Sequence, residues 1–230
     1  MVNANLCVDM GVSEDTVRRD LHELSQAGKL IKVHGGALSL AFNEVKFDSS
    51  NVYSRSNKVK IAEKAIRLIQ NNMYVLTSGG TTIIEMTKQL PPQLKATFIT
   101  GSIPAVNVYI THPNINVVMI GDKVNKAARI TVGASALSKI REVNADLCFL
   151  GTNAIDLQRG ITDNDWEVVE LKKAMVAASA KTVCLAISEK LNSFEALQVC
   201  VLKQIDYLIT ELDPDDKMLQ PYVAAGITVL

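Results

Sequence analysis

The first forty residues show an apolar period typical of an α-helix, followed by one typical of a β-hairpin. Val17, Leu21 and Leu24 recur at helical spacing and therefore share one stripe of a helix. Ser13 is suited to cap the start of this helix, and Gly28 is suited to end it. We therefore predict an amphipathic helix between Ser13 and Gly28.

Long polar side chains occupy the opposite face of this predicted helix. They are Asp15, Arg19, His22 and Gln26, with Arg18 on the flank. An apolar back and a front of hydrogen-bond donors suit a helix that lies in a DNA major groove. The same spacing occurs in ordinary amphipathic helices on protein surfaces, so periodicity alone leaves both interpretations open.

The next residues change to the pattern of a short basic hairpin. Residues 30–33 predict a strand that carries Lys32. The next residues, His34 and two glycines, allow the chain to reverse, and residues 37–38 begin a return strand. A recognition helix followed by a basic hairpin is a winged helix. Residues 3–10 predict the helix before it. Because a winged helix normally has one more helix, we expect a truncated head domain that binds operator DNA poorly.

Short apolar runs alternate with helical stretches from Lys58 onward. The runs that predict strands are residues 74–77, 96–100, 116–120, 146–150, 182–187, 207–210 and 228–230. The stretches that predict helices are residues 58–71, 82–89, 104–111, 134–142, 165–178 and 216–225. This alternation predicts an α/β domain with a mostly parallel sheet and helices on both faces. Because the segment before it is rich in Ser and Asn, we expect a head domain at 1–40, a linker at 41–57 and the large domain at 58–230.

Polar or glycine-containing turns follow the first four predicted strands. They are Ser78–Gly79–Gly80–Thr81–Thr82, Thr100–Gly101–Ser102, Gly121–Asp122 and Gly151–Thr152–Asn153. Glycine lets a backbone approach an anion, and the carboxyl ends of parallel strands meet at one edge of a sheet. One such turn is a weak indication, but four on one edge predict a ligand-binding rim.

Composition narrows the class of protein. The chain has 230 residues, and its 48% hydrophobic residues are enough for a large core. Zero net charge argues against a nucleic-acid coat protein or a polybasic membrane binder, but it permits a local basic face. The cysteines form no CxxC and the histidines no metal-ligand spacing, so we predict buried free thiols, no metal and no cofactor. Since no signal peptide or transmembrane run is present, we predict a soluble cytoplasmic protein.

Residues 12–38 resemble the helix-turn-helix and wing signature of the DeoR family of bacterial transcriptional regulators. The positions on its pattern are Gly11, Val12, Ser13, Thr16, Val17, Arg18, Arg19, Asp20, Leu21, Leu24, Gly28 and Val33–His34–Gly35–Gly36–Ala37. The resemblance implies that Arg18 and Arg19 contact DNA and that Ser13 and Thr16 lie near phosphate. The further candidates for DNA contact are His22, Lys32 and His34.

The large domain also resembles the effector domain of the DeoR family. That domain is similar to ribose-5-phosphate isomerase and the glucosamine-phosphate deaminases, and it binds phosphorylated sugars. The resemblance therefore implies an effector site at Ser78, Gly79, Thr81, Thr82, Thr100, Ser102, Gly151, Asp156, Gly160, Thr162, Glu170, Lys172 and Lys190. The rim of turns adds Gly80, Gly121 and Thr152 to this expected site. The loop before Lys190 departs from the family pattern, because Ile187 stands where the family has an acid. This departure is compatible with an unusual effector or with a weakened site.

These features predict a DNA-binding regulator, and in particular a repressor of carbohydrate-metabolism genes that a phosphorylated sugar controls. Its partners would be operator DNA, the sugar phosphate and further copies of the chain in a dimer or tetramer, since two half-sites need two recognition helices. One alternative is a sugar-phosphate isomerase or deaminase, with Asp156 and Glu170 as acid and base and Lys190 stabilising an enediolate. We predict no enzymatic activity, because the head domain would then be unexplained and Ile187 replaces an acid. Another alternative is a ligand-binding domain with a vestigial head.

Overall fold

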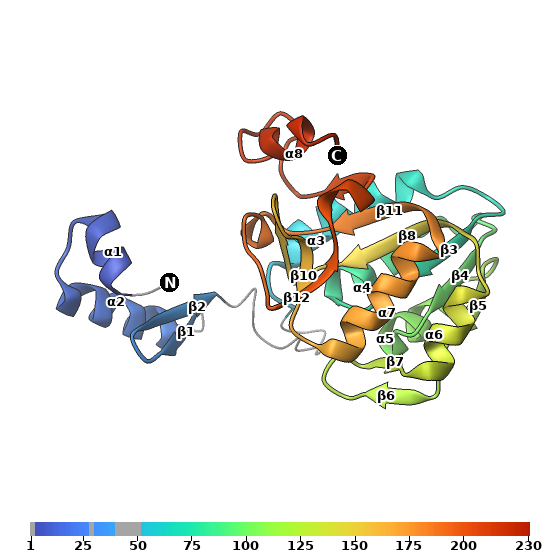
Figure 1. The fold of residues 1–230 in the computed structure, drawn as a ribbon, viewed down its shortest axis with the longest axis horizontal. Helices are drawn as coiled ribbons and strands as arrows, with labels where there is room; N and C mark the ends of the chain where they lie inside the picture. Colours follow the sequence, from blue (N-terminus) through green and yellow to red (C-terminus); the bar gives the residue numbers. More distant parts are fainter. Residues whose placement is uncertain (1–2, 28–29, 40–51) are drawn as a thin grey trace. The chain divides into compact units, whose positions relative to one another are not determined.

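The computed structural model describes residues 3–27, 30–39 and 52–230 (Figure 1). The chain divides into two compact units, the head unit at residues 1–44 and the large unit at residues 45–230. Gly28, which the sequence predicts as the end of a helix, lies outside the described residues. Residues 41–51 of the predicted linker lie outside them as well.

The head unit contains the helices and the hairpin that the sequence predicts. Helix α1 spans Asn3–Met10, and helix α2 spans Glu14–Gln26 with Ser13 as its N-cap. Strands β1 (Leu30–Val33) and β2 (Gly36–Ser39) pair antiparallel. This order of helix, recognition helix and hairpin matches a winged helix-turn-helix.

A small apolar core holds the head unit together. Val17 and Leu21 on α2 are buried with Ala37 on β2, and Leu6 of α1 packs against them. Leu24 is 38% exposed, because this core is centred one turn earlier on α2. The predicted apolar stripe is therefore confirmed at two positions and wrong at the third.

A seven-stranded parallel sheet forms the centre of the large unit. Its strands are β3 (Tyr74–Thr77), β4 (Thr97–Thr100), β5 (Asn116–Met119), β8 (Ala145–Gly151), β11 (Ser179–Leu185), β13 (Tyr207–Ile209) and β14 (Thr228–Val229). In space they follow the order β14-β13-β11-β8-β3-β4-β5, and every neighbouring pair is parallel. All the predicted strands are present, and the predicted α/β class is confirmed.

Helices cover both faces of this sheet. They are α3 (Arg55–Ala65), α4 (Thr81–Thr87), α5 (Ile103–Tyr109), α6 (Ala134–Arg141), α7 (Trp166–Ala177) and α8 (Gln220–Ala224). Helix α4 packs against both α3 and α5, and α6 packs against α7. Figure 1 shows α6 and α7 on the near face of the sheet, with α4 and α5 behind it.

Some element boundaries differ from the prediction. Helix α3 begins at Arg55, before the predicted start at Lys58. Helix α8 is shorter than predicted, because Asp216 accepts a hydrogen bond from the N–H of Met218 in a turn and Pro221 lies in the first helical turn. The residues before Gln220, which the apolar period assigns to the helix, therefore lie in a tight turn instead.

Several short strands of the large unit were not predicted. They are β6 (Lys123–Asn125), β7 (Ile130–Val132), β9 (Ala154–Asp156), β10 (Gly160–Asp163) and β12 (Leu197–Cys200). Strands β6 and β7 form a hairpin, and β9, β10 and β12 form a small antiparallel sheet in the order β12-β10-β9. These segments are three or four residues long and contain polar residues, so they show no clear apolar period.

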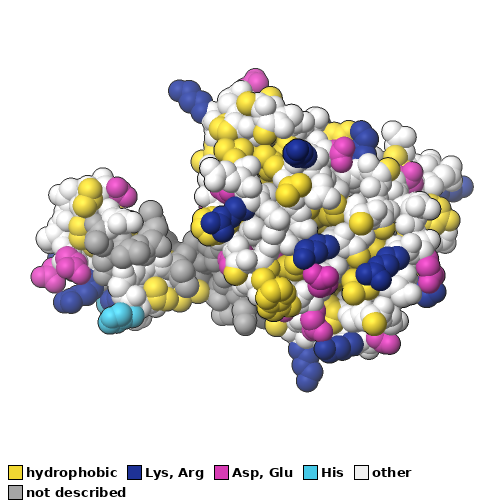
Figure 2. Space-filling view, in the orientation of Figure 1, with side chains coloured by type: hydrophobic (Ala, Val, Ile, Leu, Met, Phe, Trp, Pro, Cys, Tyr) yellow, Lys and Arg dark blue, Asp and Glu magenta, His cyan; other side chains and the backbone are white. Residues whose placement is uncertain are grey.

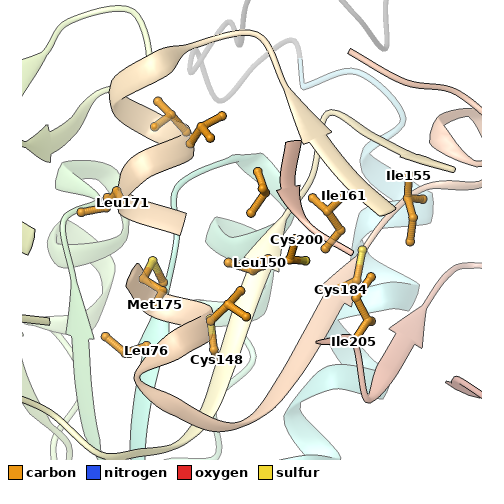
Figure 3. Packing of buried hydrophobic residues seen from close by; sticks show 14 of the residues in the cluster. Leu76, Cys148, Leu150, Ile155, Ile161, Leu171, Met175, Cys184, Cys200 and Ile205 are labelled. Carbon is orange, nitrogen blue, oxygen red and sulfur yellow. The ribbon is translucent and has the colours of Figure 1, made fainter. Parts of the chain in front are cut away.

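The core beneath the small sheet contains three of the four cysteines. Figure 3 shows Cys148, Cys184 and Cys200 among apolar side chains that include Leu76 and Leu150. Burial raises the pKa of Cys200 to about 11, and burial also raises the pKa of Cys148 and of Cys184. These three thiols therefore stay protonated and unreactive, so the prediction of buried free cysteines is confirmed for them, whereas Cys7 is only partly buried.

Candidate functional site

The exposed face of α2 carries the predicted DNA-contacting arginines. The Arg18 and Arg19 side chains are 67% and 71% exposed, and His22 is exposed beside them. Arg18 pairs with Asp15 at 3.3 Å, and Arg19 pairs with Asp20 at 3.8 Å. Exposed pairs of this kind contribute little, so both guanidinium groups can exchange these partners for phosphate or base atoms. Figure 2 shows basic and acidic side chains next to one another on this unit.

The hairpin contacts α2 through Lys32. The Lys32 ammonium donates to the backbone carbonyl of Arg18 at 3.5 Å, and Lys32 and His34 are both exposed. The Ser13 hydroxyl, by contrast, accepts the N–H of Thr16 at 3.2 Å and lies 2.9 Å from the Thr16 hydroxyl. Ser13 and Thr16 therefore build the start of the helix, while Arg18 and Lys32 share one exposed surface.

In the large unit, the order of the strands reverses between β3 and β8. From β3 the chain forms β4 and β5 toward one edge of the sheet, and it then places β8 on the other side of β3. In open α/β sheets, ligands bind at the carboxyl ends of the strands where such a reversal occurs. The two strand ends lie close together, since a Cβ atom on Gly151 would be 2.8 Å from the carbonyl oxygen of Gly79.

The turn from β3 into α4 is anchored to β8. Ser78 is buried, and its hydroxyl accepts the N–H of Gly151 at 2.9 Å. Gly80 has a φ of +113°, a conformation that residues with a side chain rarely adopt. Thr81, which is half-buried, and Thr82, which is buried, begin α4. The Ser78 hydroxyl is thus already engaged in the fold, and Thr81 is the more accessible hydroxyl of the turn.

Two lysines from other elements reach the end of β8. Lys172 on α7 is buried, and its ammonium donates to the carbonyl of Gly151 at 2.8 Å and to the carboxylate of Asp163 at 2.7 Å. Lys190, from the loop after β11, donates to the carbonyl of Thr152 at 2.6 Å. The two lysines therefore contact adjacent residues at the end of β8, and the first of these residues, Gly151, donates to Ser78 of the glycine turn.

Burial and neighbouring charges change the pKa values at this place. Burial, reinforced by the nearby ammonium groups of Lys58 and Lys172, lowers the pKa of Lys190 to about 8. Burial also lowers the pKa of Lys58 to about 8, although nearby glutamates oppose the shift. Burial raises the pKa of Asp163, but the Lys172 ammonium and the hydrogen bonds outweigh it, so the net shift is downward. Because the lysines are desolvated beside like charges, a bound anion would stabilise their charged forms.

The predicted residues after β4 and β5 have structural roles. The Thr100 hydroxyl donates to the carbonyl of Thr77 at 2.7 Å, and the Ser102 hydroxyl caps α5 by accepting the N–H of Ala105 at 3.3 Å. Gly121 has a φ of +84°, and a Cβ atom there would lie 3.0 Å from two neighbouring side chains. These residues shape the sheet edge next to the glycine turn.

The predicted residues around β9 and β10 hold the small sheet together. Asp156 accepts two backbone N–H groups at 2.9 Å in the β9–β10 turn, and Thr162 accepts another at 2.8 Å. A Cβ atom on Gly160 would lie 2.1 Å from a carbonyl oxygen of Cys200, so only glycine fits. The Thr152 hydroxyl donates to a backbone carbonyl at 3.0 Å. These residues therefore have structural roles, and they position Asp163 and the carbonyl of Thr152.

Glu170 lies apart from the other predicted site residues. Its side chain is 54% exposed and pairs with Lys173 at 2.9 Å, whereas Lys172 on the same helix is buried. Asp163, which the sequence did not single out, is the acid that contacts Lys172. Its signal in the sequence is the run Asp163–Asn164–Asp165 before α7, which reads as a helix cap, and Asp165 is indeed the N-cap.

Two family models match the chain. The DeoR-like helix-turn-helix domain matches residues 4–41, and the DeoR C terminal sensor domain matches residues 54–212. The chain belongs to the DeoR family of transcriptional regulators. The large unit accordingly contains the DeoR sensor domain, and α2 with its hairpin belongs to the helix-turn-helix domain.

Characterised DeoR-family proteins are similar over nearly the whole chain. The HTH-type transcriptional regulator GlpR of Haloferax volcanii is 30% identical over 223 residues, which are 96% of this chain and 87% of that protein. The HTH-type transcriptional regulator IolR of Bacillus subtilis is 28% identical over 216 residues, covering 94% and 86%. The HTH-type transcriptional repressor GlcR of Bacillus subtilis is 29% identical over 227 residues, covering 98% and 87%. This chain is thus a DNA-binding transcriptional regulator.

Solved structures are similar to the sensor domain at low identity. The tetrameric eIF2B-beta2-delta2 complex from C. thermophilum matches with a TM-score of 0.51 and 14% identity, covering 68% of this chain and 56% of that chain. Ribose 5-phosphate isomerase A from Methanocaldococcus jannaschii matches with a TM-score of 0.45 and 17% identity, covering 60% and 54%. The chain spans little more than half of each structure. The first of these likenesses supports the α/β fold of the DeoR sensor domain and nothing about its activity.

The structure does not assemble the acid–base pair of the enzyme alternative. Asp156 caps a turn, and Glu170 is in an exposed ion pair with Lys173. The matched DeoR relatives carry the names of regulators and repressors. In the part of the chain that the structure describes, no His, Cys, Asp and Glu side chains are grouped to hold a metal ion. No helix there is long and apolar enough to cross a membrane.

Proposed function

We propose that this chain is a repressor of carbohydrate-metabolism genes and that a phosphorylated sugar, bound at the carboxyl ends of β3 and β8, controls its affinity for operator DNA. The observation that carries this proposal is the convergence of Lys172 and Lys190 on the end of β8. Lys190 donates to a neutral backbone carbonyl, and a phosphate oxygen would be a stronger, charge-assisted acceptor.

The arrangement suggests how the effector would lie. The phosphoryl group would lie at the glycine turn, at Gly80 and Thr81, and would accept a hydrogen bond from the ammonium of Lys190. Asn153, whose amide donates to the buried Asp163 carboxylate at 2.8 Å, would bind a sugar hydroxyl group. We leave Glu170 out of the proposed site, because its side chain is exposed and paired with Lys173.

We propose that the DNA-binding unit acts together with further copies of the chain. A helix-turn-helix protein reads a two-fold operator with two recognition helices, one in each half-site. We therefore propose a homodimer or a tetramer that acts in the cytoplasm, where the operator and the sugar phosphates meet. Effector binding would favour a state of this assembly with lower operator affinity.

With a complete head domain, we expect Arg19→Ala to weaken operator binding by about 1–3 kcal/mol, because Arg19 lies on the exposed face of α2 and would contact a base edge. Lys32→Ala should instead weaken binding to all DNA sequences alike and flatten its salt dependence, as a phosphate contact does. Fluorescence anisotropy with a duplex selected by the protein from a random library, and with a scrambled duplex, measures both effects.

The matched control for Arg19→Ala is Arg141→Ala, which removes an exposed arginine from α6 of the sensor domain. This variant should bind both duplexes as the wild type does. If Arg19→Ala keeps its preference for the selected duplex, then α2 does not read the major groove.

We expect sugar phosphates to bind more weakly as the pH rises from 7 to 9. The ammonium group of Lys190 has a pKa of about 8, so it is charged below that pH and neutral above it. Because the bound phosphate needs this charge, affinity should fall by about tenfold over this range. Isothermal titration with ribose 5-phosphate, glucose 6-phosphate and fructose 1-phosphate at several pH values measures this trend.

The unphosphorylated sugars serve as controls for this titration. Ribose, glucose and fructose should not bind at either pH, because the site selects the phosphoryl group. Binding of the free sugars, or an affinity that rises with pH, would contradict a phosphate site that includes Lys190.

A further inference from the structure

A short 3-10 helix after β11 connects the proposed effector site to the start of the sensor unit. This helix, η3, spans Ser188–Lys190. Its last residue donates to the carbonyl of Thr152 at the effector site at 2.6 Å. Its middle residue, Glu189, accepts a hydrogen bond from the hydroxyl of Tyr53. Glu189 and Lys190 are adjacent in one tight turn. A movement of Lys190 toward a ligand would therefore affect the contact between Glu189 and Tyr53.

A second connection runs from the same turn through Glu211. The backbone N–H of Ser188 donates to the Glu211 carboxylate at 3.0 Å, and the Ser188 hydroxyl donates to it at 2.5 Å. The side-chain amide of Asn57 donates to the same carboxylate at 3.3 Å. Two of the three residues of η3 therefore hold the segment of residues 53–58, which we call the junction segment.

The junction segment also contacts the helix that follows the glycine turn. Arg55 pairs at 3.4 Å with Glu85, whose side chain is only 4% exposed, on α4. The ammonium of Lys58 is buried and donates to the carbonyl of Tyr53 at 2.6 Å. The segment is thus attached to both sides of the proposed site, to α4 on one side and to η3 on the other.

We infer that the junction segment carries the signal of effector binding from the sensor domain toward the DNA-binding unit. This inference rests on the proposed function of the site. A phosphate would draw the Lys190 ammonium from the Thr152 carbonyl, because the charge-assisted bond is stronger. The movement of η3 changes the Tyr53–Glu189 and Asn57–Glu211 hydrogen bonds. Residues 53–58 begin two residues after residue 51 in the sequence, so the chain leading to the head unit starts at these bonds.

Such a relay makes Tyr53 a positioning residue that does not touch the effector. Removing its hydroxyl should leave the affinity for phosphate unchanged and should reduce the response of the junction segment. Coupling between sites is typically 5–150-fold in affinity, so its loss is measurable. A residue with a purely structural role would instead change stability without separating these two effects.

The test is hydrogen–deuterium exchange on the full chain, with inorganic phosphate as the probe. In the wild type, phosphate should slow exchange at residues 78–82 and change it at residues 53–60. In Tyr53→Phe, the response at 78–82 should persist, with a dissociation constant within about twofold of the wild type. The response at 53–60 should fall by at least about fivefold.

Two further variants complete the experiment. The control variant Tyr207→Phe removes the hydroxyl of a tyrosine on β13, which accepts a hydrogen bond from Lys181 at 3.4 Å. Its hydrogen exchange should respond to phosphate as that of the wild type does. The double variant Tyr53→Phe/Asn57→Ala removes both connections to η3, in case either one suffices. A loss of response in the single or the double variant supports the relay.

Each remaining outcome overturns a defined part of the account. If phosphate protects residues 78–82 and the double variant keeps the wild-type response at 53–60, the relay is wrong and the proposed site stands. The same holds if the wild type shows no response at 53–60. If phosphate changes nothing at residues 78–82, the proposed phosphate site fails, and the relay fails with it.

Discussion

The variant Thr81→Asp should lose at least about 100-fold in affinity for sugar phosphates, because a carboxylate facing the phosphoryl group costs several kcal/mol. Thr81 is the half-buried first residue of α4, at the turn that is anchored to the end of β8. An acid at the start of a helix is favourable for the fold, so the variant should remain folded. Calorimetry with the best-binding sugar phosphate measures the loss.

The control for Thr81→Asp is Thr81→Asn, because the Asn side chain has nearly the same shape as that of Asp but carries no charge. We expect Thr81→Asn to bind within about tenfold of the wild type, since it loses only one hydroxyl hydrogen bond. An equal loss in both variants would point to shape and not to charge. Unchanged affinity in Thr81→Asp would place the phosphate elsewhere.

The variant Lys172→Met should lower the free energy of unfolding by about 3–5 kcal/mol, because it leaves a buried charge without its partner. Lys172 and Asp163 form an ion pair at 2.7 Å with side chains only 6% and 3% exposed. Lys172 also donates to the carbonyl of Gly151, so a backbone acceptor loses its donor as well. Urea unfolding followed by circular dichroism measures the change.

The neighbouring Lys173→Met provides a matched control. Lys173 pairs with Glu170 at 2.9 Å, but the two side chains are 46% and 54% exposed. Exposed pairs contribute about 0–1 kcal/mol, so this variant should unfold almost as the wild type does. A similar loss in both variants would mean that burial does not distinguish the two lysines.

The sheet could be predicted from the sequence because its strands carry a strong local signal. Runs such as Val75–Leu76 and Leu147–Leu150 are buried on both faces of a parallel sheet, so they are continuously apolar. The turn at Gly80 was also predictable, since glycine marks a backbone that other residues avoid. The small sheet of β9, β10 and β12 was not, because its strands are short and their pairing depends on distant segments.

The site was predictable only in part. Lys172 and Lys190 were predicted from a family resemblance, but the face of α7 that turns inward was not. Helix α7 is apolar on several sides, so the sequence did not show that Lys172 is buried while Glu170 is exposed. The contact of Tyr53 with Glu189 joins residues 136 positions apart, and no local pattern reports it.

The central claim is that a sugar phosphate bound at the end of β8 lowers the affinity of this DeoR-family regulator for its operator. The most direct test titrates the sugar phosphates that bind in calorimetry into the complex of the full chain with its selected duplex, followed by anisotropy. We predict that the wild type releases the duplex as the sugar phosphate rises and that Thr81→Asp retains it at every concentration. Release from Thr81→Asp at the wild-type concentration, or no release from a wild type that binds the sugar phosphate, would contradict the claim.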